Sequence, residues 1–167
     1  MTELGVADVL EIGRLVADYV FAVDERDLGR FAELWLDDAV WSANRDPVGF
    51  GPPLRGRGAV VAAFQSYFDA QGEYAPGAFV RHLCTAPRIE VVDGDVHVKT
   101  GMLSVKQEIV DGSVHTKVSR TGVYTDRVAR DDNGRWCFAE RLVAWDPPER
   151  PGIALPVELH GPPSPQD

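Results

Sequence analysis

Four side chains of this chain have the types that proton transfer requires: Asp24, His82, Tyr19 and Arg141. An aspartate beside a histidine in one pocket can move protons to and from a bound molecule, because the carboxylate orients the imidazole and supports its positive charge. A tyrosine hydroxyl can donate a hydrogen bond to an oxygen, and an arginine can hold developing negative charge. Tyr19 and Asp24 are close in the sequence, but His82 and Arg141 are far from them and from each other, so the fold has to bring the four together.

Asp24 follows the clearest amphipathic helix in the chain. An apolar stripe at the helical period carries Ile12, Leu15, Val16, Tyr19, Val20 and Val23. Asp24 comes one turn after Val20, on the face that should be buried, and near the helix C-terminus, where the dipole opposes a negative charge. The spacing alone leaves a second interpretation open, in which Asp24 caps the helix or lies in solvent.

The other three residues also have ordinary structural interpretations. His82 lies in a strand-like run, where a lone histidine can simply be a core or surface residue. Tyr19 can be a core tyrosine, and Arg141 can form a salt bridge with Asp126, the residue that faces it if the hairpin has a two-residue turn.

The elements that must position these residues are of two kinds. A second short helix is predicted over 28–35, a strand over 37–44, an irregular Gly- and Pro-rich loop over 45–58, and a third helix over 58–71. Strand-like runs follow at 79–92, 95–110, 113–130 and 135–146, and they are separated by Asp-Gly, Asp-Gly and Asn-Gly turns. Helices followed by an antiparallel meander predict an α+β fold with the helices on one face of a curved sheet.

Strand alternation predicts which residues share a face. It places His82 and Arg141 on one side of the sheet, and a bulge near Pro87 would reverse this placement. We expect a pocket wall made of residues from this side and from the helices, namely Trp41, Phe64, Phe68, Leu103, Val105, Tyr124 and Val143. The other side is also partly apolar, which favours contact with a second subunit.

Composition narrows the classes of function. At 167 residues the chain is long enough for one domain with a core and a pocket, predicted over 1–147, followed by a Pro-rich tail over 148–167. The net charge of −9 argues against nucleic acid or an anionic membrane surface as partner. No transmembrane-length run or leader pattern is seen, so we expect a cytoplasmic protein with reduced thiols at Cys84 and Cys137. No metal-ligand spacing, dinucleotide fingerprint, Walker loop or nucleophile elbow occurs, so no metal or cofactor is expected.

Four motifs resemble those of one superfamily. They are Y-x-x-x-x-D-x-x-D from Tyr19, F-x-x-L-W-x-x-D-A-x-W from Phe31, R-H-x-x-T-x-P-R-I-E-V from Arg81, and Y-T-D-R-V-x-R…G-R-W-x-F-x-x-R from Tyr124. Over residues 8–146 the chain resembles the SnoaL-like branch of the nuclear-transport-factor-2-like superfamily. The resemblance implies a curved antiparallel sheet wrapped against three helices, a cone with a deep apolar pocket.

The resemblance also implies roles for residues. Asp24 and His82 match the catalytic pair of the dehydratase-like branch, and Tyr19 and Arg141 match a tyrosine and an arginine of a bile-acid dehydratase. The dehydrochlorinase of this superfamily shares the aromatic residue at Trp41 but has lysine in place of Tyr19, which argues against dehydrochlorination here.

The expected function is therefore that of a cofactor-independent, dehydratase-like lyase or an isomerase, acting on a small apolar ring compound and forming a homodimer or homotrimer. A polyketide cyclase is an alternative among enzymes. Two other classes remain open: a non-catalytic ligand-binding module, and a small beta-type subunit of a ring-hydroxylating dioxygenase.

Overall fold

The computed structural model describes residues 3–44 and 50–146. It contains three helices, α1 (Val6–Asp24), α2 (Leu28–Glu33) and α3 (Arg57–Gln71). The seven strands are β1 (Trp35–Ala43), β2 (Leu54–Arg55), β3 (Phe79–Cys84), β4 (Arg88–Val92), β5 (Asp95–Val110), β6 (Ser113–Arg130) and β7 (Trp136–Trp145). The predicted α+β class is confirmed. The predicted tail and part of the Gly- and Pro-rich loop lie outside the described residues.

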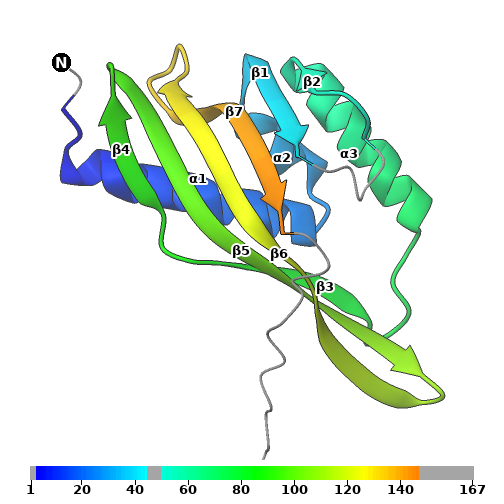
Figure 1. The fold of residues 1–167 in the computed structure, drawn as a ribbon. Coiled ribbons are helices and arrows are strands. Elements are labelled where there is room, and N and C mark those ends of the chain that lie inside the picture. The colour runs from blue at the N-terminus through cyan, green and yellow to red at the C-terminus, as the bar shows by residue number, and fades with distance from the viewer. Residues whose placement is uncertain (1–2, 45–49, 147–167) are drawn as a thin grey trace, which may run out of the picture.

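The strands form one curved sheet in the order β2-β1-β7-β6-β5-β3, and β4 also pairs with β5. All neighbours are antiparallel except β1 and β7, which run parallel. Strands β5 and β6 are the longest and run the whole length of the sheet, and the helices lie against one of its faces (Figure 1). This arrangement leaves the C-terminal end of α1 beside β3 and so brings Asp24 close to His82.

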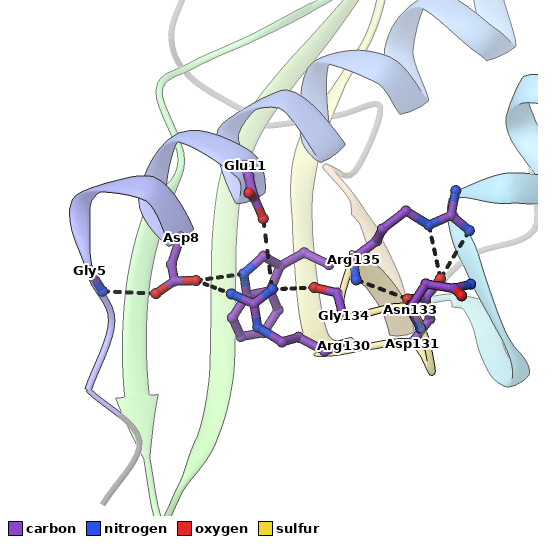
Figure 2. Close-up of polar contacts among 9 residues, drawn as sticks. Gly5, Asp8, Glu11, Arg130, Asp131, Asn133, Gly134 and Arg135 are labelled. Atoms are coloured by element: carbon purple, nitrogen blue, oxygen red, sulfur yellow. Dashed lines mark hydrogen bonds and ion pairs between the residues drawn. The ribbon is translucent and has the colours of Figure 1, made fainter.

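Helix α1 is held at both ends. Its predicted apolar stripe is buried in the core, with Ile12, Leu15, Val16, Tyr19 and Val20 less than a tenth exposed. At its N-terminus, Asp8 accepts hydrogen bonds from the backbone N–H of Gly5 at 2.8 Å and from Nε1 of Trp136 at 3.1 Å, and it pairs with Arg130 (Figure 2). These contacts tie the start of α1 to the β6–β7 hairpin, and thereby fix the direction in which its far end points.

The β4–β5 hairpin keeps the register of its two-residue turn, whereas the β5–β6 and β6–β7 hairpins each shift by one residue. Beside the β6–β7 turn Ala129 faces Cys137, one residue away from the predicted register, and a shift between Arg127 and Val128 restores it. Asp126 faces Arg141 across β6 and β7, as predicted. On β5 and β6 the predicted register holds from the turn as far as Val105 and Val118, and then shifts by one residue at Ser119. This bulge is held by hydrogen bonds between Ser119 and Ser104, with Oγ–Oγ 2.6 Å apart. Beyond this bulge, His97 faces Arg127.

The predicted strand over 79–92 is divided into β3 and β4 by Thr85–Pro87, where proline removes a backbone donor. Both pieces pair with β5, but the registers differ by one residue, so that Arg88 faces Lys99 whereas His82 faces Ser104. The prediction that His82 shares a face with Leu103 and Val105 is therefore wrong. A one-residue shift turns every side chain of a strand to the opposite face.

Candidate active site

Asp24 and His82 form a direct pair. The carboxylate Oδ1 lies 2.6 Å from Nδ1 of the His82 ring, and Oδ2 accepts the backbone N–H of His82 at 2.9 Å. The side chains are 4% and 17% exposed respectively. Because both carboxylate oxygens bind the same residue, the helix end fixes the position and the orientation of the imidazole.

The contact with Asp24 makes the two ring nitrogens of His82 chemically different. A carboxylate only accepts hydrogen bonds when ionised, so Nδ1 carries the proton that it donates to Asp24. The other nitrogen, Nε2, is then the basic one and the one left for a ligand. The arrangement can therefore accept a proton at Nε2 while the carboxylate stabilises the resulting imidazolium.

Arg141 is buried and forms an ion pair with Asp126. Nε donates to Oδ1 at 2.8 Å and a terminal nitrogen to Oδ2 at 2.7 Å, and both side chains are fully buried. The guanidinium carbon also lies 3.9 Å from the ring centroid of Tyr19, 4.3 Å from that of Tyr124 and 4.0 Å from that of Phe138. Burial lowers the pKa of Arg141, but the charge of Asp126 and its hydrogen bonds outweigh this and raise it, so the group stays cationic.

Tyr19 and Tyr124 lie edge-to-face beneath this cation, with ring centroids 5.7 Å apart. Burial raises the pKa of Tyr19, although the Arg141 charge opposes it, and burial and the neighbouring Tyr19 raise the pKa of Tyr124 well above its ordinary value. Both phenols therefore keep their protons at neutral pH and are available as hydrogen-bond donors.

Two hollow spaces meet at His82. An inner cavity of about 50 Å³ is bounded mainly by aromatic residues, among them Tyr19, Trp41, Phe50, Phe64, Tyr124 and Trp145. An outer groove of about 510 Å³ runs along the ends of α1 and α3 and the facing strands, and its walls include Phe68, Gln71, Ser104, Lys106, Glu108 and Ser119. Val23, Tyr67, His82 and Arg120 line both spaces.

The structure brings most of the predicted pocket residues together. Trp41, Phe64, Tyr124 and Val143 line the inner cavity, and Phe68 lines the outer groove. Leu103 and Val105 line neither space, because the shifted β3 register turns Ser104 inward in their place.

Arg141, expected to hold a ligand oxygen, lies behind the tyrosines and is paired with Asp126, the alternative that the hairpin register allowed.

Five residues on the wall of the inner cavity were not predicted as part of the site: Val23, Phe50, Tyr67, Arg120 and Trp145. Tyr67 lies on the apolar stripe of the third helix, and Trp145 is two residues after Val143 and so on the same face of the strand. Both could therefore have been predicted from the sequence. Phe50 stands in the Gly- and Pro-rich loop, where no periodicity marks it, and its ring packs 5.0 Å from that of Trp41.

Within residues 3–44 and 50–146, no three His, Cys, Asp or Glu side chains gather as metal ligands. Over the same residues, no helix has the length and apolarity needed to cross a bilayer.

Known proteins share the fold of this chain. A profile described as a SnoaL-like domain matches residues 5–142. A solved structure from Catenulispora acidiphila is 26% identical, with a TM-score of 0.67, over 84% of this chain and 92% of that one. A hexachlorocyclohexane dehydrochlorinase (LinA) type 2 is 26% identical, with a TM-score of 0.63, over 85% and 87%.

A structure described as a putative scytalone dehydratase from Novosphingobium aromaticivorans shares the fold at 18% identity, with a TM-score of 0.64, over 85% of this chain and 86% of that one. None of the curated proteins compared with the chain matches it significantly.

Proposed function

The chain belongs to the SnoaL-like domain family, and from that premise we propose that it is a cofactor-independent lyase or isomerase whose acid–base pair is Asp24 and His82. The observation that carries the proposal is the 2.6 Å contact between Asp24 Oδ1 and His82 Nδ1, at the point where the two hollow spaces meet. A histidine oriented in this way is a general base without need of a metal or cofactor.

In this mechanism Nε2 of His82 removes a proton from a carbon of the bound ring compound. Asp24 keeps its own negative charge and stabilises the imidazolium, as a buried carboxylate does for a histidine base. The proton then returns to another carbon, which is isomerisation, or leaves with a hydroxyl group as water, which is dehydration. General acid–base assistance of this kind contributes on the order of 10² to 10⁴ in rate.

Tyr19 is the donor that we place at the developing oxyanion, because its hydroxyl remains protonated and its residue lines the inner cavity. Arg141 acts through the tyrosines, as a positioning residue. Its cation lies against both rings, and Asp126 fixes it there.

The sizes of the two spaces limit where the ligand can lie. The inner cavity, at about 50 Å³, is well below the roughly 300–1,000 Å³ typical of ligand pockets, whereas the outer groove at about 510 Å³ falls within that range. We therefore place the body of the ligand in the outer groove. Since that groove also has Gln71, Lys106 and Glu108 on its walls, a ring compound with polar substituents suits it better than a wholly apolar one.

Proton abstraction can be tested without knowing the natural substrate. We expect the protein to catalyse deuterium incorporation from D₂O into cyclic ketones, followed by mass spectrometry, and to eliminate water from their β-hydroxy derivatives. His82→Ala should lower the rate by about 10² to 10⁴, while His115→Ala, at an exposed position on β6, should leave it unchanged. Full activity in folded His82→Ala would overturn the proposal and favour a ligand-binding module.

A further inference from the structure

Helix α1 has a second apolar stripe, on the side opposite the one that packs in the core. Three of its large side chains, Val6, Leu10 and Phe21, are between 53% and 79% exposed. Ala17 lies between Leu10 and Phe21 on the same line and is also exposed. Successive members are one or two helical turns apart, so they form one continuous line along the helix, which we call the outward stripe.

The outward stripe makes α1 apolar on two opposite sides. A helix of this kind is typically covered on both of them. The first stripe is covered by the core, whereas the second remains exposed within the described part of the chain. Single exposed apolar residues are normal on a protein surface, but large ones aligned on one helix face indicate a surface that contacts another protein.

The order of side chains along the outward stripe fits a second copy of the same helix in an antiparallel orientation. With a twofold axis at the middle of α1, Leu10 of one copy faces Ala17 of the other. In the same alignment Val6 faces Phe21. Each contact places a larger side chain against a smaller one and occurs twice, as in an isologous interface. The stripe is therefore complementary to itself in shape.

The charges beside the outward stripe fit the same orientation. The guanidinium of Arg14, near the middle of α1, has no ion pair or hydrogen-bond partner within the described part of the chain. Glu11 lies one turn earlier on the same edge of the helix, and its half-exposed carboxylate has a contact of 3.8 Å with Arg130. Equivalent edges meet in an antiparallel pair of helices, so Arg14 of each copy comes within reach of Glu11 of the other.

The middle of α1 also allows the two helices to approach each other. Gly13 has open space where a Cβ would lie, and the distance between packed helices depends on the side chains at their contact. Since α1 has 19 residues, it is roughly 28 Å long and about 10 Å wide. Such a face is smaller than the roughly 800 Å² per partner of a standard interface, so the association should be weak and reversible.

We propose that the outward stripe of α1 is a self-association surface, on which a second copy of this chain docks with its own α1 antiparallel. Leu10 packs on Ala17 in this contact, and Arg14 pairs with Glu11. The contact does not depend on the proposed function, because Asp24 and His82 lie outside it. It is also separate from the sheet face that carries Leu83, which is opposite the helices.

Cross-linking through introduced cysteines tests the orientation. We expect an oxidised equal mixture of Leu10→Cys and Ala17→Cys to give a disulfide between the two variants, identified by mass spectrometry of the linked peptides. Neither variant should link to itself, because equivalent residues would be about 10 Å apart along the axis, beyond the roughly 7 Å between Cα atoms that a disulfide spans. A Leu10→Cys protein that links to itself instead would indicate parallel helices and overturn the proposal.

Sedimentation velocity of the wild-type chain supplies a measurement that needs no variant. Its average sedimentation coefficient should increase with protein concentration over the micromolar to millimolar range, which is typical of weak complexes. Leu10→Glu should remove this increase. The matched control is Val114→Glu, because Val114 is 62% exposed against 60% for Leu10 but lies beside the β5–β6 turn, which projects beyond the helices (Figure 1).

The control variant should keep the increase of the wild-type chain. A sedimentation coefficient that is independent of concentration, or an increase that survives Leu10→Glu, would overturn the second copy as the occupant of the outward stripe. Absence of the disulfide between Leu10→Cys and Ala17→Cys would do the same, and the stripe would then belong to a contact with a different protein.

Discussion

Replacement of Asp126 by asparagine tests how the buried cation at the centre of the site is stabilised. In the wild-type chain both carboxylate oxygens accept hydrogen bonds from Arg141, at 2.8 and 2.7 Å, and neither side chain is exposed. Asparagine keeps one acceptor, but its amide N–H₂ meets a guanidinium N–H, so one hydrogen bond is lost. The positive charge is also left without its counterion.

Breaking a fully buried ion pair by removing one partner costs about 3–5 kcal/mol, because the remaining charge is uncompensated. For a chain of this size each kcal/mol shifts Tm by roughly 2–4 °C, so we expect a decrease of about 6–20 °C. Thermal and urea unfolding followed by circular dichroism would measure it. The free energy of unfolding should fall by a large part of the 5–15 kcal/mol that most domains have.

The chain offers a matched control one residue away in the same hairpin. Glu140 pairs with Arg127 across β6 and β7 at 2.8 Å, but both side chains are partly exposed. Glu140→Gln should therefore cost only about 0–1 kcal/mol. The double variant Asp126→Leu with Arg141→Met should recover most of the lost stability, because it removes both charges together.

A loss below about 1 kcal/mol in Asp126→Asn, similar to the loss in the control, would contradict the description of this ion pair as buried. It would mean that water reaches the guanidinium.

Three further predictions concern the buried tyrosines, two glycines and the exposed face of the sheet. Because burial raises the pKa of Tyr19 and Tyr124, the stability that their protonated forms confer is fully present below pH of about 10, the ordinary value in unfolded chains, and is lost as the pH rises further. The phenolate absorbance of Tyr19 and Tyr124 should rise only as the protein unfolds and its circular dichroism is lost. Phenylalanine at either position should remove one of the two tyrosines that ionise at this high pH. Gly122→Ala should destabilise by about 1–3 kcal/mol, since a Cβ there would lie 2.6 Å from the carbonyl oxygen of Ala144. Gly13→Ala, in open space within α1, should instead stabilise by about 1 kcal/mol, and urea unfolding of the two variants checks the opposite signs. Leu83→Lys should dissociate the expected homodimer or homotrimer in sedimentation equilibrium, because this leucine is 52% exposed on the sheet face opposite the helices. An unchanged oligomer would exclude that face as the interface.

Much of the fold could be predicted from local patterns. The apolar stripe of α1 and the Asp-Gly and Asn-Gly turns are each decided by residues close in sequence, and they gave the helix and the hairpins. Asp126 does face Arg141 as predicted, but a shift between Arg127 and Val128 is needed to restore the register that differs by one residue beside the turn. The proximity of Asp24 and His82 was suggested by motif resemblance and by the buried position of Asp24. The 2.6 Å contact is consistent with both.

The parts that sequence did not reveal depend on packing between distant segments. The interruption at Thr85–Pro87 changes the register of β3 by one residue, and the bulge at Ser119 changes that of β6, so the inward residue is Ser104. Turn chemistry fixes the register only near the turn, and these two shifts lie many residues away from it. Phe50 could not be foreseen for a similar reason, because only the packing of its loop against Trp41 and Phe64 places its ring.

The hydrogen bond between Asp24 and His82 is tested most directly by the NMR signal of the ring Nδ1 proton of His82, in the wild-type chain and in Asp24→Asn. A short hydrogen bond to a buried carboxylate predicts a far-downfield proton attached to Nδ1, slow to exchange with water, that disappears or moves strongly upfield in Asp24→Asn. The substitution Asp38→Asn, at an exposed position on β1, should leave the signal in place. Observation of the proton on Nε2, or of a signal that is the same in both proteins, would contradict the account, because His82 would then lack the carboxylate partner that makes it a base.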